Sequence, residues 1–192
     1  MAHHLHSSLS IEKWYYTLTY SNLLLIIFIE GNMEEDIDLL WKKKLIFSGV
    51  FVLENKLHTV LDRYLEDITS KQWLVLVVAS SFSTPPDLSK VGKALGCSRQ
   101  NIKKLAMALE KEGMVRLKES ESDGRSLCIH LTDKGKTVLQ NSKDLEEKVY
   151  NSLFKEFSRE EISHYYSLSK KFNKGIGYLE KCFHDLKEKG EM

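Results

Sequence analysis

The chain has 192 residues, a length that favours one domain and leaves room for a second small one. Hydrophobic residues make up 42% and charged residues 29%, with only two prolines, which excludes a collagen-like, low-complexity or wholly disordered chain. The formal net charge is +1, so no global charge indicates a nucleic-acid partner, and evidence for one must come from local clustering.

Residues 1–32 differ in character from the rest of the chain. The uncharged run 14–29 is sixteen residues long, shorter than the roughly 18 expected of a membrane span, and no signal-peptide pattern surrounds it. The codons of Glu30-Gly31, just before Met33, would be purine-rich, as a bacterial ribosome-binding site is. We therefore expect 1–32 to be an extension that is disordered or not translated in the cell. A short membrane anchor or a buried helix is the alternative.

The segment from Ile37 to Tyr64 has apolar residues mostly at three- and four-residue steps, the period of a long amphipathic helix. Three capping patterns then mark further helix starts. They are Thr69-x-x-Gln72, Thr84-Pro85-Pro86-Asp87 and Ser158-x-x-Glu161. In the second pattern we expect Thr84 to be the N-cap residue, with Pro85 at the first helical position.

Two short helices joined by a tight turn are expected after the second pattern. The first, over 88–95, is expected to end at Gly96. Ser98 is placed to cap the second, which has an apolar stripe over 102–109 and is expected to end at Gly113. This arrangement is a helix-turn-helix.

A hairpin is expected next. Residues 115–118 alternate between apolar and basic side chains, and 127–131 form a second alternating run. The polar loop between them contains Asp123-Gly124, a strong turn signal. The predicted fold class is mainly α with a small β-hairpin wing: a winged helix-turn-helix with long N- and C-terminal helices.

The remaining residues are expected to form two helices. Thr132-Asp133 is placed to cap a long helix that continues through Leu153. The last helix carries an a/d heptad seam, which favours association with a second copy over packing on its own domain. The seam consists of Ile162, Tyr165, Ser169, Phe172, Ile176, Leu179, Phe183 and Leu186. We expect Phe172, Ile176, Leu179 and Phe183 to form the dimer contact.

Positive charge is concentrated on the helix-turn-helix. Residues 89–108 include five basic residues and no acid: Lys90, Lys93, Arg99, Lys103 and Lys104. The first residues of such a second helix reach base edges in the major groove, where Arg pairs with guanine and Gln with adenine. We expect DNA contacts from Ser98, Arg99, Gln100, Lys103 and Lys104. A solvated charged face is the alternative.

The wing supplies a further candidate contact. Arg125 lies at its tip, where a guanidinium can enter a narrow minor groove, and Asp123 is placed to hold it. A surface ion pair between the two, worth ~0–1 kcal/mol, is the alternative.

Residues 69–135 resemble the winged helix of the MarR family of bacterial transcription regulators. The matching runs are LGCSRQNIKKLAMALEKEGMV over 95–115 and DGRSLCIHLTDKG over 123–135, together with Thr69-x-x-Gln72. The expected order of the helices also resembles that of the family, from residue 33 to about residue 189. It implies a homodimer with two winged helices on a pseudo-palindromic operator, and frequent release by a small ligand or by oxidation.

The resemblance also implies a domain organisation. After the extension 1–32, residues 33–68 would be an N-terminal dimerisation helix and 69–135 the DNA-binding region. Residues 136–192 would be the C-terminal dimerisation helices. A cytoplasmic protein without a membrane partner is expected.

Two features depart from the family pattern. Leu117 stands where a basic residue is frequent, and Glu119 and Glu121 stand where the wing often has prolines. With Asp123 they make the wing acidic, and acids repel phosphate, so we expect modest, salt-sensitive affinity.

The three cysteines are odd in number and widely spaced, which favours a reducing compartment over a disulfide framework. Cys97 precedes the second helix of the helix-turn-helix. A packing role is the simpler interpretation, and a redox-reactive thiolate near Arg99 is the alternative. No histidine pair has zinc-site spacing, so no metal and no cofactor are expected.

No catalytic constellation is present in the sequence, which argues against an enzyme. The leading hypothesis is a repressor released by an apolar or phenolic ligand, with oxidation at Cys97 as the alternative signal. Candidate ligand-contacting aromatics are Trp41, Phe47, Trp73 and Phe82. A winged helix used for protein contact is a further alternative.

Overall fold

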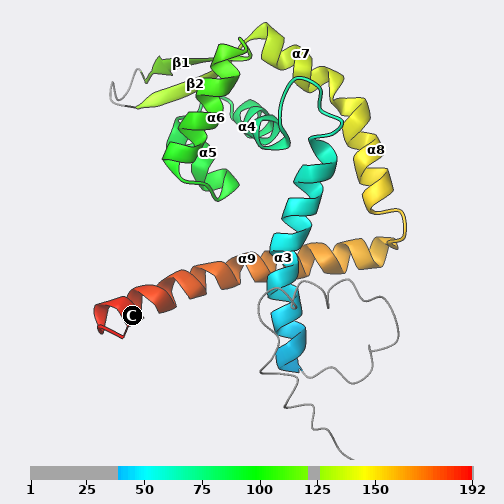
Figure 1. Ribbon diagram of the computed structural model, residues 1–192, viewed down its shortest axis with the longest axis vertical. Coiled ribbons are helices and arrows are strands. Elements are labelled where there is room, and N and C mark those ends of the chain that lie inside the picture. The colour runs from blue at the N-terminus through cyan, green and yellow to red at the C-terminus, as the bar shows by residue number, and fades with distance from the viewer. Residues whose placement is uncertain (1–38, 121–125, 192) are drawn as a thin grey trace, which may run out of the picture. The chain divides into compact units, whose positions relative to one another are not determined.

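The computed structural model describes residues 39–120 and 126–191 (Figure 1). They form two compact units, the first ending at Thr132 and the second beginning at Asp133. The extension 1–32 and the wing tip, including Asp123 and Arg125, lie outside the described residues. No helix in the described ranges is long and apolar enough to cross a membrane.

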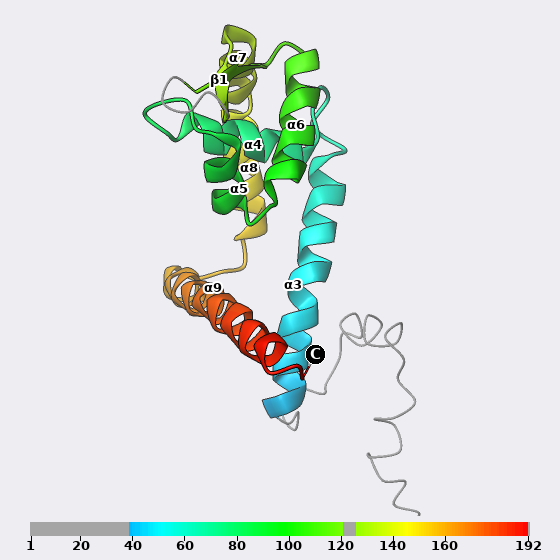
Figure 2. The same cartoon turned by 90° about the vertical axis from the view of Figure 1, so that its left-hand side faces the viewer.

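The first unit contains four helices and a hairpin among its described residues. They are α3 (Leu39–Leu61), α4 (Ser70–Ser80), α5 (Leu88–Leu95), α6 (Arg99–Lys111), β1 (Val115–Glu119) and β2 (Leu127–Leu131). Helices α4, α5 and α6 pack together beside the hairpin (Figure 2). Their shared core includes Leu76 of α4, Val91 of α5, Ile102 and Leu109 of α6 and Ile129 of β2, all fully buried.

The predicted hairpin is confirmed. The two strands are antiparallel, with Val115 opposite Leu131 and Leu117 opposite Ile129. A short bridge between Asp87 and Cys128 attaches the segment before α5 to the outer side of β2. The wing is therefore joined to the helix-turn-helix at a point that hairpin patterning alone does not reveal.

The start of α5 differs from the prediction. The N-cap residue is Asp87, whose Oδ1 accepts a hydrogen bond from the Lys90 amide at 2.8 Å, and not Thr84. The buried Pro86 precedes the helix, and its carbonyl accepts from the Ile129 amide at 2.9 Å. This bond and the bridge from the extended Asp87 to Cys128 hold Pro86 and Asp87 beside the hairpin, so the helix begins only after Asp87.

The turn between α5 and α6 depends on two glycines. Gly96 has φ +65°, the left-handed conformation expected of a residue that ends a helix. Gly92 is buried in α5, and a Cβ there would lie 2.7 Å from the Cys97 carbonyl oxygen. The Cys97 amide donates to the Gly92 carbonyl at 2.8 Å, so α6 begins in direct backbone contact with α5.

The second unit contains α7 (Asp133–Asn141), α8 (Lys143–Leu153) and α9 (Arg159–Glu188). The prediction of one long helix after the hairpin is wrong, because that segment is divided at Ser142. The Ser142 hydroxyl donates to the Leu139 carbonyl at 2.9 Å, a local bond that competes with the helical pattern.

The other two capping patterns are confirmed. Thr69 with Gln72 begins α4, and Ser158 with Glu161 begins α9, each through reciprocal hydrogen bonds between side chain and backbone. The backbone and hydroxyl bonds from Ser158 lower the pKa of Glu161, because they stabilise its carboxylate.

Candidate nucleic-acid interface

Helix α6 presents one buried and one exposed face. The Ser98 hydroxyl accepts from the Asn101 amide at 3.2 Å and caps the helix, as the sequence predicts. Ile102, Ala106 and Leu109 are fully buried against the unit. Because successive residues are rotated by about 100° around the helix axis, these three side chains point to one side of α6. The opposite side therefore faces solvent.

The four predicted α6 contacts lie on or beside this exposed side. Arg99, Gln100, Lys103 and Lys104 are all exposed, and the first acidic residue of the helix is Glu110. The first six residues of the helix therefore include three cationic side chains and two amides, those of Gln100 and Asn101, groups that suit phosphates and base edges. Such a surface can bind a polyanion without rearranging the core.

The two lysines of α5 differ from each other. Lys90 lies 3.6 Å from the Asp87 carboxylate, so part of its charge is compensated. Lys93 is also exposed, at the other end of the helix. The basic surface is thus carried mainly by α6.

The hairpin is tied directly to α6. Oε1 of Glu110 accepts a hydrogen bond from the Leu117 amide at 2.7 Å. Leu117 is half-buried in the sheet, and the Ser120 amide donates to the Ser126 carbonyl at 2.8 Å beyond it. Sequence reasoning missed Glu110, because only the packing of β1 against α6 gives its carboxylate a backbone partner.

Cys97 is half-buried in the turn before α6, and its thiol donates to the Leu95 carbonyl at 3.6 Å. This contact fits the packing role. The structure leaves the redox alternative as a hypothesis.

A polar network joins α3 to α4. The hydroxyl of the fully buried Ser70 lies 2.7 Å from Nδ1 of His58, and the Ser70 amide donates to Oδ1 of Asp62 at 2.6 Å. The Ser70 bonds lower the pKa of Asp62, with smaller contributions from His58 and Lys71. These residues are up to twelve positions apart, so no local pattern in the sequence indicates the network.

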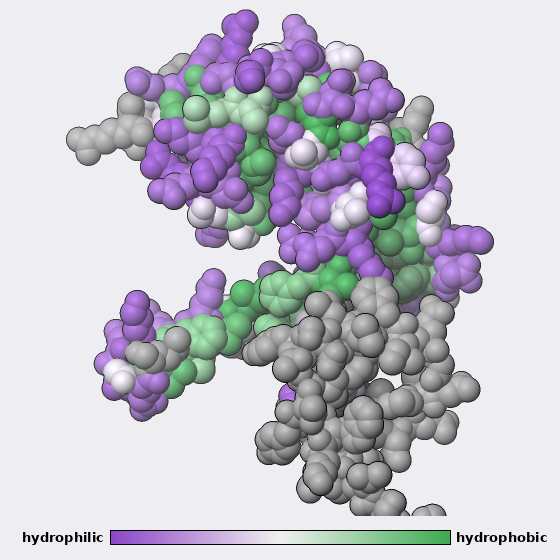
Figure 3. Space-filling model, viewed as in Figure 1, coloured by the Kyte–Doolittle hydropathy of each residue, from purple (hydrophilic) through white to green (hydrophobic). Residues whose placement is uncertain are grey.

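The predicted dimer seam is exposed in the single chain. Phe172, Ile176, Leu179 and Phe183 have exposed fractions of 41%, 48%, 43% and 49%. Figure 3 shows hydrophobic residues along much of α9. The ring of Phe157, just before α9, packs edge-on against Phe154 and Tyr165.

The N-terminal long helix also exposes apolar residues. Ile46, Phe47, Phe51 and Leu53 of α3 each have more than half of their surface exposed, and the rings of Phe47 and Phe51 contact each other at 5.4 Å. Apolar side chains exposed on this scale are typical of surfaces that bind another protein chain.

The aromatic residues proposed for a ligand lie at separate places. Trp41 and Phe47 are in the first half of α3, Trp73 is in the first turn of α4, and Phe82 follows α4. Trp41 is thirteen residues from Glu54 and seventeen from His58, two α3 residues that contact α4, or roughly 20–25 Å along the helix. Within one chain, α3 and α4 do not gather the four rings into one cluster.

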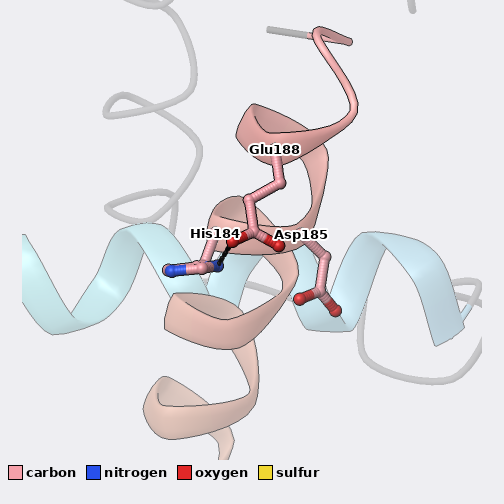
Figure 4. Close-up of side chains that lie close together, drawn as sticks. All are labelled: His184, Asp185 and Glu188. Carbon is pink, nitrogen blue, oxygen red and sulfur yellow. Dashed lines mark ion pairs between the residues drawn. The ribbon is translucent and has the colours of Figure 1, made fainter.

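One cluster of metal-ligand atoms is present near the end of α9 (Figure 4). His184, Asp185 and Glu188 place their ligand atoms within 4.8 Å of one another, and Nδ1 of His184 lies 3.6 Å from Oε1 of Glu188. All three are exposed, and an ordinary surface ion pair accounts for the arrangement. Histidine spacing in the sequence does not indicate this set, because two of its three members are carboxylates.

No protein-family model matches the chain. Among proteins of known function, it is 28% identical over 123 residues to the HTH-type transcriptional regulator MgrA of Staphylococcus aureus. The match spans 64% of this chain and 77% of MgrA. The relative is therefore a transcription regulator with a helix-turn-helix.

Solved structures give the same fold. A MarR/EmrR-family regulator from Acinetobacter sp. ADP1 has a TM-score of 0.65 at 21% identity, covering 74% of this chain and 99% of that one. The S. aureus MepR–DNA complex has a TM-score of 0.62 at 19% identity, covering 68% and 97%. The organohalide-sensing RdhR regulator bound to 2,4-dichlorophenol has a TM-score of 0.61 at 15% identity, covering 79% and 87%. The resemblance to the MarR family is confirmed, and the chain has the winged-helix fold of that family's regulators.

Proposed function

We propose that this chain is a sequence-specific transcription regulator that binds double-stranded DNA through α6. The observation that carries the proposal is the exposed basic side of α6, capped by Ser98 at the end that a helix-turn-helix directs into the major groove. MepR, a structural neighbour, has been solved bound to DNA.

Each contact residue has a role that its chemistry suits. Arg99 and Gln100 read base edges, and Lys103 and Lys104 neutralise phosphates. Ser98 shapes the helix N-terminus, where a phosphate is stabilised. Arg125, positioned by Asp123, enters the minor groove from the wing.

We further propose that the protein acts as a homodimer on a pseudo-palindromic operator. The exposed apolar seam of α9 and the exposed apolar residues of α3 support this assembly. Two α6 helices would then read half-sites one helical turn apart, about 34 Å.

The test is the salt dependence of binding to duplex DNA. Each neutralised phosphate releases counterions, so log K falls with log salt at about 0.9 per contact. Replacing both Lys103 and Lys104 by Ala should reduce that slope by about two. Replacing the exposed Lys187 and Lys189 at the end of α9 by Ala is the matched control and should leave the slope unchanged.

A winged helix used for protein contact makes the opposite prediction. In that case the wild type binds no duplex at low salt, or the two double variants lower the slope equally. Either result would reject α6 as the DNA-binding surface.

For the regulatory signal we favour a small apolar or phenolic ligand that makes the protein release its operator as a repressor. RdhR has been solved with 2,4-dichlorophenol, a phenolic compound. Oxidation of Cys97 is the second candidate, favoured by its place one residue before the cap of α6.

Peroxide treatment separates the two signals. If the ligand is the signal, wild type and Cys97→Ser should keep the same DNA affinity after peroxide. If wild type loses DNA on peroxide, recovers it with thiol and Cys97→Ser does neither, the cysteine is the switch.

A further inference from the structure

Met107 is exposed on α6 although the helix has a well-formed buried face. Its exposed fraction is 53%, whereas Ile102, Ala106 and Leu109 are fully buried. In α6, all thirteen of whose residues are described, no other large apolar side chain is exposed. The core of the unit therefore does not account for a methionine at this position.

Met107 lies in line with the residues proposed to contact DNA. It is seven positions after Gln100, and at about 100° per residue the two point within roughly 20° of each other. Lys103 and Lys104 lie one turn before it, and Lys111 one turn after it. Met107 is thus an apolar side chain on an otherwise polar and basic line.

The surroundings of Met107 determine what it can contact. The exposed lysines of α6 attract a polyanion and disfavour a purely apolar partner surface. In the major groove of DNA, the apolar group presented by the bases is the 5-methyl group of thymine. Methionine is unbranched and polarisable, so its side chain adapts to such a small apolar target.

We propose that Met107 is a specificity-determining residue that packs against a thymine methyl group in the major groove. This inference rests on the proposed function, because it requires α6 to lie in that groove. It adds a requirement for thymine that the hydrogen bonds of Arg99 and Gln100 do not supply.

Deoxyuridine tests the contact directly, because it lacks the methyl group and keeps the hydrogen-bonding groups of thymine. The probe is a duplex enriched from a random pool by the full chain, with each thymine replaced by deoxyuridine, one symmetric pair at a time. At one of these symmetric pairs, replacing thymine by deoxyuridine should weaken wild-type binding about fourfold per half-site. This factor corresponds to ~0.8 kcal/mol, the contribution of one methyl-sized apolar group. Met107→Ala should lose at least as much affinity for the thymine duplex. Its affinity should not change when thymine at that symmetric pair is replaced by deoxyuridine.

Lys111→Ala is the matched control, since it removes an exposed side chain one turn away on the same line. It should keep the full deoxyuridine effect. Met107→Leu should keep part of it, because it retains an apolar side chain of similar size. Thermal melting of each variant checks that the fold is unchanged, as an exposed helical position predicts.

The inference is overturned if no thymine shows a methyl effect in the wild type, or if Met107→Ala retains that effect in full. Both results leave the proposed function standing, because a sequence has still been enriched. If the pool yields no preferred sequence, or if binding has no salt dependence, the proposed function fails, and this inference fails with it.

Discussion

At the scale of single residues, we expect the side chains in the first turn of α6 to contribute most of the hydrogen bonds by which the proposed interface reads bases. Arg99→Ala and Gln100→Ala should each weaken binding to the enriched duplex by roughly 1–3 kcal/mol and broaden its sequence preference. Lys104→Ala should weaken all duplexes alike, because it removes a phosphate contact. Dissociation constants on the enriched duplex and its single-base variants measure both effects. Unchanged affinity and preference in Arg99→Ala and Gln100→Ala would rule out major-groove reading by these residues.

A second residue-scale prediction concerns pH. The Ser70 bonds lower the pKa of Asp62 in the folded chain. Its carboxylate therefore contributes stability above its ordinary unfolded pKa, and this contribution is lost as the pH falls through the lowered folded value. Asp62→Asn should reduce the free energy of unfolding at pH 7 by about 0.5 kcal/mol, a small value because Asp62 is exposed.

Denaturant titrations at several pH values between 3 and 7 measure this difference. The wild-type and Asp62→Asn stabilities should converge toward the acid end of the range. Asp67→Asn, which changes another exposed acid in the same connection, is the control. A difference between wild type and Asp62→Asn that is constant with pH would contradict the ionic origin.

At the scale of elements, the hydrogen bond from the Leu117 amide to Glu110 joins α6 to the wing. Glu110→Ala should speed hydrogen exchange at the Leu117 amide and weaken binding to all duplexes by a few-fold, corresponding to about 1 kcal/mol for one hydrogen bond. Glu110→Gln keeps an acceptor oxygen and should restore much of the protection. Unchanged exchange at Leu117 in Glu110→Ala would show that strand pairing alone holds β1.

Helix and strand positions were predictable where a local signal is complete. The boxes at Thr69 and Ser158 and the stop at Gly96 depend on neighbouring residues, and the structure confirms them. The start of α5 depends on the contact between Pro86 and Ile129, and the division at Ser142 on the hydrogen bond from its hydroxyl to the Leu139 carbonyl. Sequence periodicity does not resolve such choices.

At the scale of the whole molecule, the proposed dimer predicts how α9 responds to charge. Ile176→Asp combined with Leu179→Asp places two unpaired charges in the proposed apolar contact, which is costly. Sedimentation should show that this variant is a monomer or unfolded. Ser167→Asp combined with Tyr178→Asp adds the same charge away from the seam and should leave the assembly unchanged. A seam variant that remains a folded dimer of wild-type affinity would contradict the proposed contact.

By itself, the sequence determined the order of the elements as far as the hairpin, the winged helix-turn-helix and the basic first turns of α6. These depend on caps, periodicity and charge spacing, all of which act over a few residues. Only the tertiary structure decided that Gly92 must allow the Cys97 carbonyl to approach, that Glu110 holds β1, and that Ser70 joins His58 to Asp62. It also separated the buried Ile102 from the exposed Met107. These features require residues of different helices, strands or turns to meet, and that proximity arises only when the helices and the hairpin pack around one core.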